Sequence, residues 1–400
     1  MKIALVHDYI KEYGGAERVL EALTEIFPDA PIYTAFYKEE SEAYKRLKNR
    51  KIIASWVQNI PFFADKLHSP LRFLAPFIWG SFKEEFKKYD LIISSASWYI
   101  TKGFGSRCHP ELVSGSSPAR DTLRSEEMLK LVQHDNCRKP LEICYCHTPP
   151  RWLYGYTTSV NFQKYPIVKA YAAIVGHFMR LYDFKSAQKV DYFIANSKET
   201  ASRIKKFYRR NSSIIYPLVD LPRTTNDQRQ KTKDYYFIVS RLVGGKGLEM
   251  AIEAAQKAGF KLKIAGAKSG YWNLSEKVKE NIEFLGQVSD EELTKLYKGA
   301  KAFLALSKDE DFGITPVESM SVGTPVIAYN GGGYKETVLP GKTGLLFDDY
   351  SVDGLIQAIK QFNNLTINYK DCIEQAEKFS KERFKKEIKI FVEKCLKHAY

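Results

Sequence analysis

Short apolar runs alternate with amphipathic, helix-like segments along most of the chain. The apolar run 2–6 leads into a polar connector, and a segment opening at Gly14-Gly15 then carries apolar residues at helical spacing. Further apolar runs occupy 32–36, 91–94, 141–146 and 192–195. This alternation predicts an α/β fold with a parallel sheet covered by helices.

The pattern restarts after a polar stretch. Residues 220–234 read DLPRTTNDQRQKTKD, which predicts an interdomain linker. Beyond it we expect a helix over 248–257 and apolar strands at 235–239, 262–265, 282–285, 302–306 and 326–328. The 400 residues therefore predict two doubly wound Rossmann-like domains, 1–219 and 235–400, with the last helix packing back on the first domain. Ligands of such sheets bind at the carboxyl ends of the strands.

One segment, 106–138, interrupts the alternation. It is net neutral and serine-rich, and its thirty-three residues stand where a connection of about 2–6 residues would be ordinary. Its HPELVSGS start and VQHD ending resemble peptides read through from dispersed repeat elements of bacterial genomes. We interpret it as a passenger insertion in a loop, and the alternative is a functional lid or regulatory loop. Because it enters at the amino end of the run 141–146, away from the ligand edge, the lid is disfavoured.

Composition narrows the class of protein. With 44% hydrophobic, 14% aromatic and 27% charged residues, the chain is neither disordered, nor collagenous, nor a disulfide scaffold. Its six cysteines lack paired zinc spacing and favour a reducing cytoplasm. No apolar run reaches the roughly 18 residues of a membrane-spanning helix. The apolar run at the N-terminus, which ends before His7, is too short for the hydrophobic core of a signal peptide. We expect a cytoplasmic globular protein.

Charge is unevenly distributed. The net charge is +14, and residues 139–220 hold thirteen basic against five acidic side chains, most densely over 198–210. Such a patch attracts the phosphates of nucleic acid, anionic lipid or a lipid-linked substrate, whereas a solvated helix face is the plainer interpretation. Aromatic and basic residues do not interleave as on a nucleic-acid platform, so we expect no nucleic acid and consider an anionic membrane surface, at the inner face of the plasma membrane.

The block EDFGITPVE, 310–318, follows the run 302–306 and opens a helix. Thr315, Pro316 and Glu318 fit an N-cap, a first-turn proline and an N3 glutamate, so a capping box would explain Glu318.

A capping box does not explain Glu310, Asp311 and the Phe-Gly pair in the same loop. Two carboxylates eight residues apart, Glu310 and Glu318, bracket a helix start that can receive a phosphate. They suit a ligand with hydroxyls at both ends and a diphosphate between them, which describes a nucleotide sugar.

These residues also resemble a known family. Glu310 and Glu318 match the E-x7-E element of retaining glycosyltransferases of the GT-B group, family 4. Further segments that resemble the family, in the family's order, are GGAERVL (14–20), CHTPPRWLYG (146–155), SRLVGGKG (240–247) and SVGTPVIAYNGGGYKETV (321–338). The likeness covers nearly the whole chain except 106–138, and its wording is most similar to bacterial mannosyltransferases that use GDP-mannose in surface-polysaccharide assembly.

The resemblance implies a GT-B fold and roles for individual residues. Arg241 and Lys246 would hold the donor diphosphate, where two cations in a dry cleft stabilise the departing nucleoside diphosphate without a metal. The alternative is an exposed Arg and Lys beside a glycine turn. Glu318 would bind the ribose hydroxyls and Glu310 the sugar hydroxyls. The adjoining donor-site residues would be Phe312, Gly313, Ile314 and Thr315.

Two features of the first domain complete the expected site. Gly14 and Gly15 would bring backbone amides to the phosphate at a helix start, although a tight turn also explains them. His147 directly follows the run 141–146, and the resemblance places it beside the reacting sugar, whereas an isolated histidine is more often structural. No H-x-x-x-H or D-x-D pattern occurs, so we expect neither a metal nor a cofactor.

The sequence therefore predicts a retaining hexosyltransferase that moves mannose from GDP-mannose onto a saccharide or lipid-linked acceptor. Retention in this family is described as front-face displacement assisted by the leaving diphosphate, which needs no enzymic nucleophile. Two alternatives stay open: an epimerase or phosphorylase of the same fold, and a catalytically dead basic protein that binds membranes or phosphate.

Overall fold

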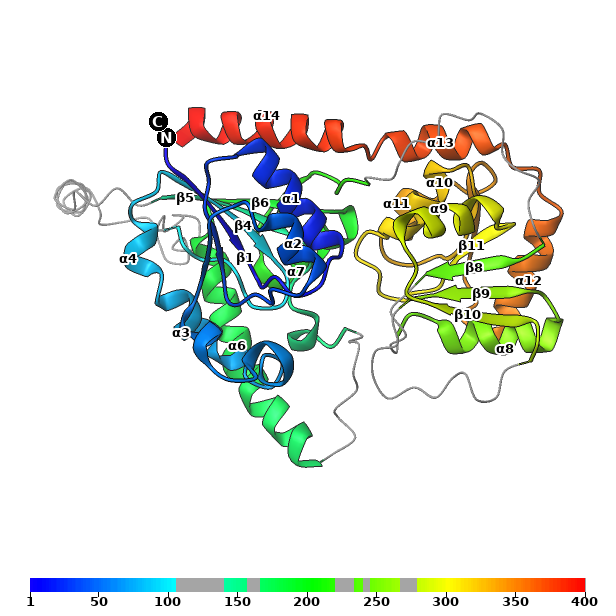
Figure 1. Cartoon of the computed structure of the whole chain (residues 1–400), viewed down its shortest axis with the longest axis horizontal. Helices are drawn as coiled ribbons and strands as arrows, with labels where there is room; N and C mark the ends of the chain where they lie inside the picture. The colour runs from blue at the N-terminus through cyan, green and yellow to red at the C-terminus, as the bar shows by residue number, and fades with distance from the viewer. Residues whose placement is uncertain (106–139, 157–165, 220–233, 240–244, 267–278, 400) are drawn as a thin grey trace, which may run out of the picture.

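The computed structural model describes residues 1–105, 140–156, 166–219, 234–239, 245–266 and 279–399. Two α/β units lie side by side, each built on a parallel sheet, so the predicted fold class is confirmed (Figure 1). The insertion 106–138, all but the last residue of the linker 220–234, and Arg241 fall outside the described residues.

The first sheet has seven parallel strands in the order β3-β2-β1-β4-β5-β6-β7. They are β1 (Ile3–His7), β2 (Ile32–Thr34), β3 (Ile52–Ala54), β4 (Leu91–Ala96), β5 (Leu141–Cys146), β6 (Tyr192–Ala195) and β7 (Ser213–Ile214). Every residue of β4 and β5 is buried, as expected for strands with helices on both faces.

Among the described residues, the helices that precede the linker are α1 (Gly15–Ile26), α2 (Glu42–Leu47), α3 (Ala75–Gly80), α4 (Lys83–Phe86), α6 (Pro166–Lys189) and α7 (Lys198–Tyr208). The short helical turns described in this unit are η1 (Trp56–Asn59), η2 (Phe63–Leu67) and η3 (Arg72–Leu74), which lie between β3 and α3, and η5 (Arg151–Leu153), which lies between β5 and α6. Helix α1 forms where the apolar spacing predicts it, because Val19, Leu20, Leu23 and Ile26 all face the core.

The second sheet has six parallel strands in the order β10-β9-β8-β11-β12-β13. They are β8 (Tyr236–Val239), β9 (Leu262–Ala265), β10 (Ile282–Gly286), β11 (Ala302–Ala305), β12 (Val326–Tyr329) and β13 (Gly344–Phe347). The helices are α8 (Leu248–Ala258), α9 (Asp290–Gly299), α10 (Ile314–Ser321), α11 (Tyr334–Thr337), α12 (Val352–Asn363), α13 (Tyr369–Glu377) and α14 (Lys381–Ala399).

Helix α14 leaves the second unit and runs along the first, which brings the two chain ends close together (Figure 1). Phe384, Ile388, Val392 and Cys395 join the same buried cluster as the apolar face of α1. The apolar face of the last helix therefore belongs to the core of the first unit.

The two switch points of the sheets decide where a ligand can bind. All strands are parallel, but the direction in which successive strands are added to the sheet reverses between β1 and β4 and between β8 and β11. Ligands bind beyond the carboxyl ends of the strands at such switch points. The attachment of the insertion lies at the opposite edge, since Gly105 donates its amide to Glu142 at the start of β5 (2.9 Å). Within the described residues, no helix is long and apolar enough to span a membrane.

Candidate active site between the two sheets

Lys246 and Glu310 meet at the carboxyl edge of the second sheet. Lys246 follows β8 and Glu310 follows β11, and the Lys246 Nζ donates to the Glu310 Oε2 at 2.8 Å. Burial acts to raise the pKa of Glu310, but Lys246 and Arg151 outweigh it and lower the pKa to about 2. At neutral pH the site therefore holds an ionised carboxylate paired with an ammonium group.

The Glu310 loop is held by the glycine-rich segment after β12. The Gly333 amide donates to the Glu310 carbonyl at 2.9 Å, and a Cβ on Gly332 would lie 2.1 Å from that oxygen. A larger residue at 332 would push the loop away, so this close approach requires glycine. The glycines of the segment that resembles the family thus position Glu310 through the backbone.

The start of α10 differs from the prediction. Its N-cap is Gly313, in the left-handed conformation with φ +87°, and Ile314 is the first helical residue. The expected capping box, with Thr315 as N-cap and Glu318 at N3, is therefore wrong, because the glycine lets the chain enter the helix two residues earlier. Glu318 lies beyond the first turn.

Glu318 instead binds two residues from other elements. Its Oε1 accepts from the Arg18 Nη1 at 2.9 Å, and its Oε2 accepts from the Tyr297 hydroxyl at 3.0 Å. Arg18 lies on α1, so this contact joins the two units. With 4% exposure, Glu318 is a buried carboxylate whose charge is balanced by an arginine. Sequence reasoning assigned no role to Arg18 or Tyr297, although Arg18 lies in the GGAERVL motif.

Asp311 is a second junction between the units. The Arg151 Nη2 lies 2.7 Å from the Asp311 Oδ2, and the Arg203 Nη1 lies 2.5 Å from the Oδ1. The Ser197 hydroxyl donates to the Asp311 carbonyl at 2.5 Å. Two arginines of the first unit thus surround one carboxylate of the second.

The same face includes the start of α7. The amides of Lys198 and Glu199 donate to the Glu336 carboxylate at 2.8 and 3.1 Å, so a carboxylate of the second unit occupies this helix N-terminus. The interpretation of 198–210 as a free basic patch or a solvated face is therefore partly wrong. Arg203 is 2% exposed, and Arg210 donates to backbone carbonyls at the end of α6.

The starts of α1 and α10 face each other across the units. A Cβ on Gly15 would lie 2.4 Å from the Ile314 Cδ1, so the two helix beginnings are in contact. Both present partial positive charge to the same space, which favours an anion such as a phosphate. The Gly14 amide already donates to the Glu17 Oε2 at 2.9 Å, so it is engaged within its own helix.

His147 lies directly after β5 and is 9% exposed. Its Nε2 is 2.8 Å from the Ser95 Oγ, which in turn lies 3.0 Å from the His7 Nδ1. Burial, with a smaller contribution from His7, lowers the pKa of His147 to about 3, so its ring is neutral at physiological pH. His7 is the last residue of β1 and Ser95 the last but one of the neighbouring β4, but single polar residues near the ends of short apolar runs gave no distinguishing signal.

The Phe312 side chain is not at the ligand edge. Its ring is 2% exposed and packs against Tyr216 and Phe379, with centroids 5.7 and 5.3 Å away. Of this predicted site residue only the main chain is available to a ligand. Thr315 and Ile314 are partly exposed in the first turn of α10.

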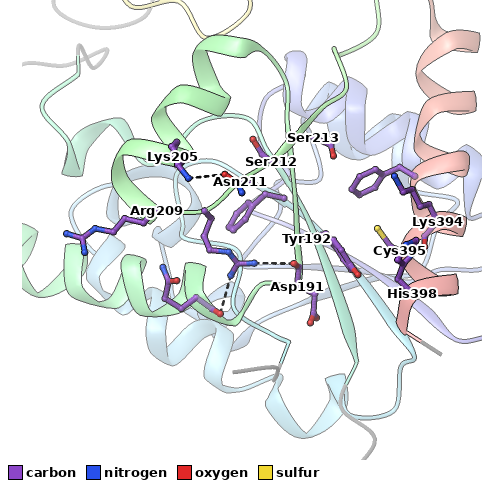
Figure 2. Close-up of a pocket in the computed structure, with 14 residues that line it drawn as sticks. Asp191, Tyr192, Lys205, Arg209, Asn211, Ser212, Ser213, Lys394, Cys395 and His398 are labelled. Atoms are coloured by element: carbon purple, nitrogen blue, oxygen red, sulfur yellow. Dashed lines mark hydrogen bonds between the residues drawn. The ribbon is translucent and has the colours of Figure 1, made fainter. Parts of the chain in front are cut away.

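A separate hollow of about 630 Å³ lies away from these residues (Figure 2). It is bordered by Asp191 and Ser212 before β6 and β7 and by Lys394, Cys395 and His398 of α14. Because it lies at the amino ends of these strands, it belongs to the edge opposite the switch point. No group of three or more His, Cys, Asp or Glu that could hold a metal occurs in the described parts of the chain.

Comparison with known families decides the class of protein. Residues 224–379 match the family described as "Glycosyl transferases group 1". The chain is a glycosyltransferase that is similar to this group over the matched residues. The matched region contains Lys246, Glu310 and Glu318.

Relatives of this glycosyltransferase extend beyond that region. It is 29% identical over 216 residues to an uncharacterized glycosyltransferase of Methanocaldococcus jannaschii, covering 52% of this chain and 59% of that protein. It is 24% identical over 401 residues to the alpha-1,3/1,6-mannosyltransferase of Candida glabrata, covering 85% and 78% of the two chains. The archaeal alignment thus spans less than two thirds of that relative's length.

Solved structures match the glycosyltransferase over both units. The Anabaena protein HepE in complex with UDP and glucose superposes with a TM-score of 0.63 at 17% identity, covering 98% of this chain and 99% of that chain. Sucrose-phosphate synthase from Thermosynechococcus elongatus reaches 0.67 at 16% identity over the whole of both chains. At this identity the likeness establishes the GT-B fold.

Proposed function

We propose that this glycosyltransferase transfers a hexose, with retention and without a metal, from a nucleoside-diphosphate sugar to a saccharide or lipid-linked saccharide in cell-surface polysaccharide synthesis. The observation that carries the proposal is the Lys246–Glu310 pair, which lies at a switch point beside two converging helix N-termini. This arrangement supplies positive charge for a diphosphate and a carboxylate for sugar hydroxyls within one small region.

Each end of the donor then has a residue. The diphosphate binds Lys246 and the starts of α1 and α10, with Arg241 as the second cation expected from the sequence. Glu310, ionised through its cationic neighbours, accepts hydrogen bonds from sugar hydroxyls. Glu318 accepts from the ribose hydroxyls and must share its carboxylate with Arg18 to do so.

GDP-mannose is the favoured donor, and mannose is the sugar transferred. The support comes from the sequence motifs EDFGITPVE and CHTPPR and from relatives named alpha-1,3/1,6-mannosyltransferase in Candida glabrata and Mus musculus. The complex of HepE with UDP and glucose makes UDP-glucose the donor to compare it with.

The reaction needs no enzymic nucleophile. The bond between the sugar C1 and the diphosphate oxygen breaks while the acceptor oxygen bonds to C1 on the same face. The acceptor's proton passes to the departing phosphate oxygen, so charge and atoms balance. Lys246 stabilises the charge that grows on the diphosphate, which is where preorganised cations contribute most. Neutral His147 hydrogen-bonds the sugar.

A ligand screen and a transfer assay test this proposal. A ligand present at 100 times its dissociation constant adds about 2.7 kcal/mol to the free energy of unfolding. At equal concentration GDP-mannose, as the tightest ligand, should therefore raise the melting temperature more than UDP-glucose, UDP-galactose or UDP-N-acetylglucosamine. Product should form from the stabilising donor when a saccharide acceptor is added. Product that forms without an acceptor would support an epimerase. Phosphate-dependent cleavage of a glycoside would support a phosphorylase. Binding without any turnover would support a catalytically dead protein.

We also propose that the enzyme works at an anionic membrane surface, the inner face of the plasma membrane, which suits a lipid-linked acceptor. Helix α6 carries an outward apolar stripe of Tyr171, Ile174, Phe178 and Leu181, spaced three or four residues apart and 42% to 65% exposed. The acidic residue of α6, Asp183, is fully buried, so the charges exposed along this helix are cationic. Apolar residues flanked by cations favour anionic lipid.

The stripe lies next to the catalytic side of the first unit. Arg180 of α6 donates to the Leu153 carbonyl in η5 at 3.3 Å, and Tyr154 donates to Asp183 at 2.6 Å. The helix that would contact lipid therefore supports the segment that carries Arg151.

The double variant Ile174→Ser/Phe178→Ser should lose most of its binding to anionic vesicles, measured by flotation, because it removes two of the most exposed apolar side chains. Ile390→Ser, at an apolar position of α14 that is 54% exposed, should bind as wild type. Binding should also weaken between low and physiological salt, where exposed charges are screened over about 8–10 Å. Equal binding of all variants, or equal binding to neutral vesicles, would contradict this surface.

A further inference from the structure

Four polar side chains, from α1, β1, β4 and the residue after β5, form a row that ends at His147. The Glu17 Oε1 of α1 lies 3.6 Å from the His7 Nε2 at the end of β1. The His7 Nδ1 lies 3.0 Å from the Ser95 Oγ of β4, and Ser95 lies 2.8 Å from the His147 Nε2 after β5. The row crosses the switch point of the first sheet.

This row is shielded from water. His7 is 2% exposed and Ser95 1%, and the Glu17 side chain retains 12%. The Glu17 Oε2 is fixed by the Gly14 amide at 2.9 Å, which holds the carboxylate beside His7. Buried polar groups of this kind need their hydrogen bonds, so the direction of each bond in the row is constrained.

The carboxylate sets that direction. Ser95 carries one hydroxyl proton, so it donates to one histidine and accepts from the other. In a neutral His7 ring, a proton on Nε2 faces Glu17 favourably and leaves Nδ1 as an acceptor for Ser95. The Ser95 oxygen must then accept from the His147 Nε2. The reverse direction would place a nitrogen lone pair against the Glu17 carboxylate, which is repulsive.

We propose that Glu17, His7 and Ser95 are positioning residues that hold His147 with its proton on Nε2, so that Nδ1 accepts a hydrogen bond from a hydroxyl of the bound sugar. The tautomer follows from the row of side chains, and the contact with a sugar rests on the proposed function. Since Ser95 engages Nε2, Nδ1 is the ring nitrogen left for a ligand. A neutral ring is required for this role, and burial keeps His147 neutral.

Nitrogen NMR of the ligand-free enzyme tests the tautomer without reference to activity. With 15N-labelled histidine, and with the His147 signals assigned by their loss in His147→Asn, we expect a protonated Nε2 and an unprotonated Nδ1. Ser95→Ala and Glu17→Gln should each shift the signals toward the other tautomer, because a glutamine amide can donate to a lone pair on His7. Ser95→Thr and Glu21→Gln, the latter on the same helix, should keep the wild-type pattern.

Kinetics supply the second readout. Ser95→Ala should lower kcat by about tenfold, the value of one hydrogen bond, with little change in the dissociation constant of the free nucleotide. Ser95→Thr should recover most of the rate. A wild-type Nδ1–H signal, or signals unmoved by both Ser95→Ala and Glu17→Gln, would overturn the proposal. Expected signals in a protein that transfers no sugar would leave the tautomer standing and refute the proposed function.

Discussion

Replacing Lys246 with Ala should lower kcat/KM for sugar transfer by about 10²-fold or more, because the ammonium stabilises charge that grows as the nucleoside diphosphate departs. Lys246 and Arg151 are the two charges that lower the pKa of Glu310, and the variant removes the first of them. The pKa of Glu310 should therefore rise from about 2 toward its usual range. Steady-state kinetics with a saturating acceptor measure the first effect.

Lys257→Ala is the matched control for Lys246→Ala. Lys257 lies in the same unit and pairs with Asp353, but both side chains are exposed and far from the switch point, so activity should be unchanged. The melting temperature of Lys246→Ala should stay close to that of wild type. Wild-type turnover in Lys246→Ala would remove this residue from the donor site.

The two carboxylates of the E-x7-E element should respond differently to loss of charge. Glu310→Gln should damage sugar transfer more than binding of the free nucleotide, because its carboxylate is assigned to the sugar. Glu318→Gln should weaken binding of the nucleoside diphosphate itself, since it is assigned to the ribose. Titration calorimetry with the free nucleotide, beside transfer kinetics, measures both.

Arg18 provides the control that separates two explanations for Glu318. Arg18→Ala removes the contact across the units while leaving the Glu318 carboxylate available. If nucleotide binding falls in Glu318→Gln and is retained in Arg18→Ala, Glu318 acts on the ligand. Equal losses would mean that Glu318 acts by joining the units, and the reverse order for Glu310 and Glu318 would exchange the two ends of the ligand.

Local pattern was sufficient for most of the regular structure. The run 141–146 became β5 and the run 192–195 became β6 with the same bounds, because parallel strands covered on both faces consist mostly of apolar residues. Strands β3, β7 and β13 were not predicted. Two of them have only two or three residues, and such short segments are stabilised by their neighbours in the sheet more than by their own pattern.

The chain order also placed the candidate site residues. Since Lys246, Glu310 and His147 follow apolar strands, the parallel topology was enough to put each at a carboxyl edge. The conformation of Gly313 was not predictable in the same way, because Thr315 and Pro316 suit a helix start equally well two residues later. Packing of the loop against Tyr334, which a Cβ on Gly313 would meet at 2.7 Å, is specific to the folded chain.

The sequence by itself determined the two parallel sheets, the polar break between them and the strand ends that carry the candidate chemistry, because these depend on local periodicity and chain order. The tertiary structure alone decided the partners of those residues. Arg18 and Glu318 are three hundred residues apart, and Asp311 meets Arg151 and Arg203 only through the way the two units face each other. Charge pairs between residues so far apart in sequence depend on the relative orientation of the two units, which no local pattern encodes.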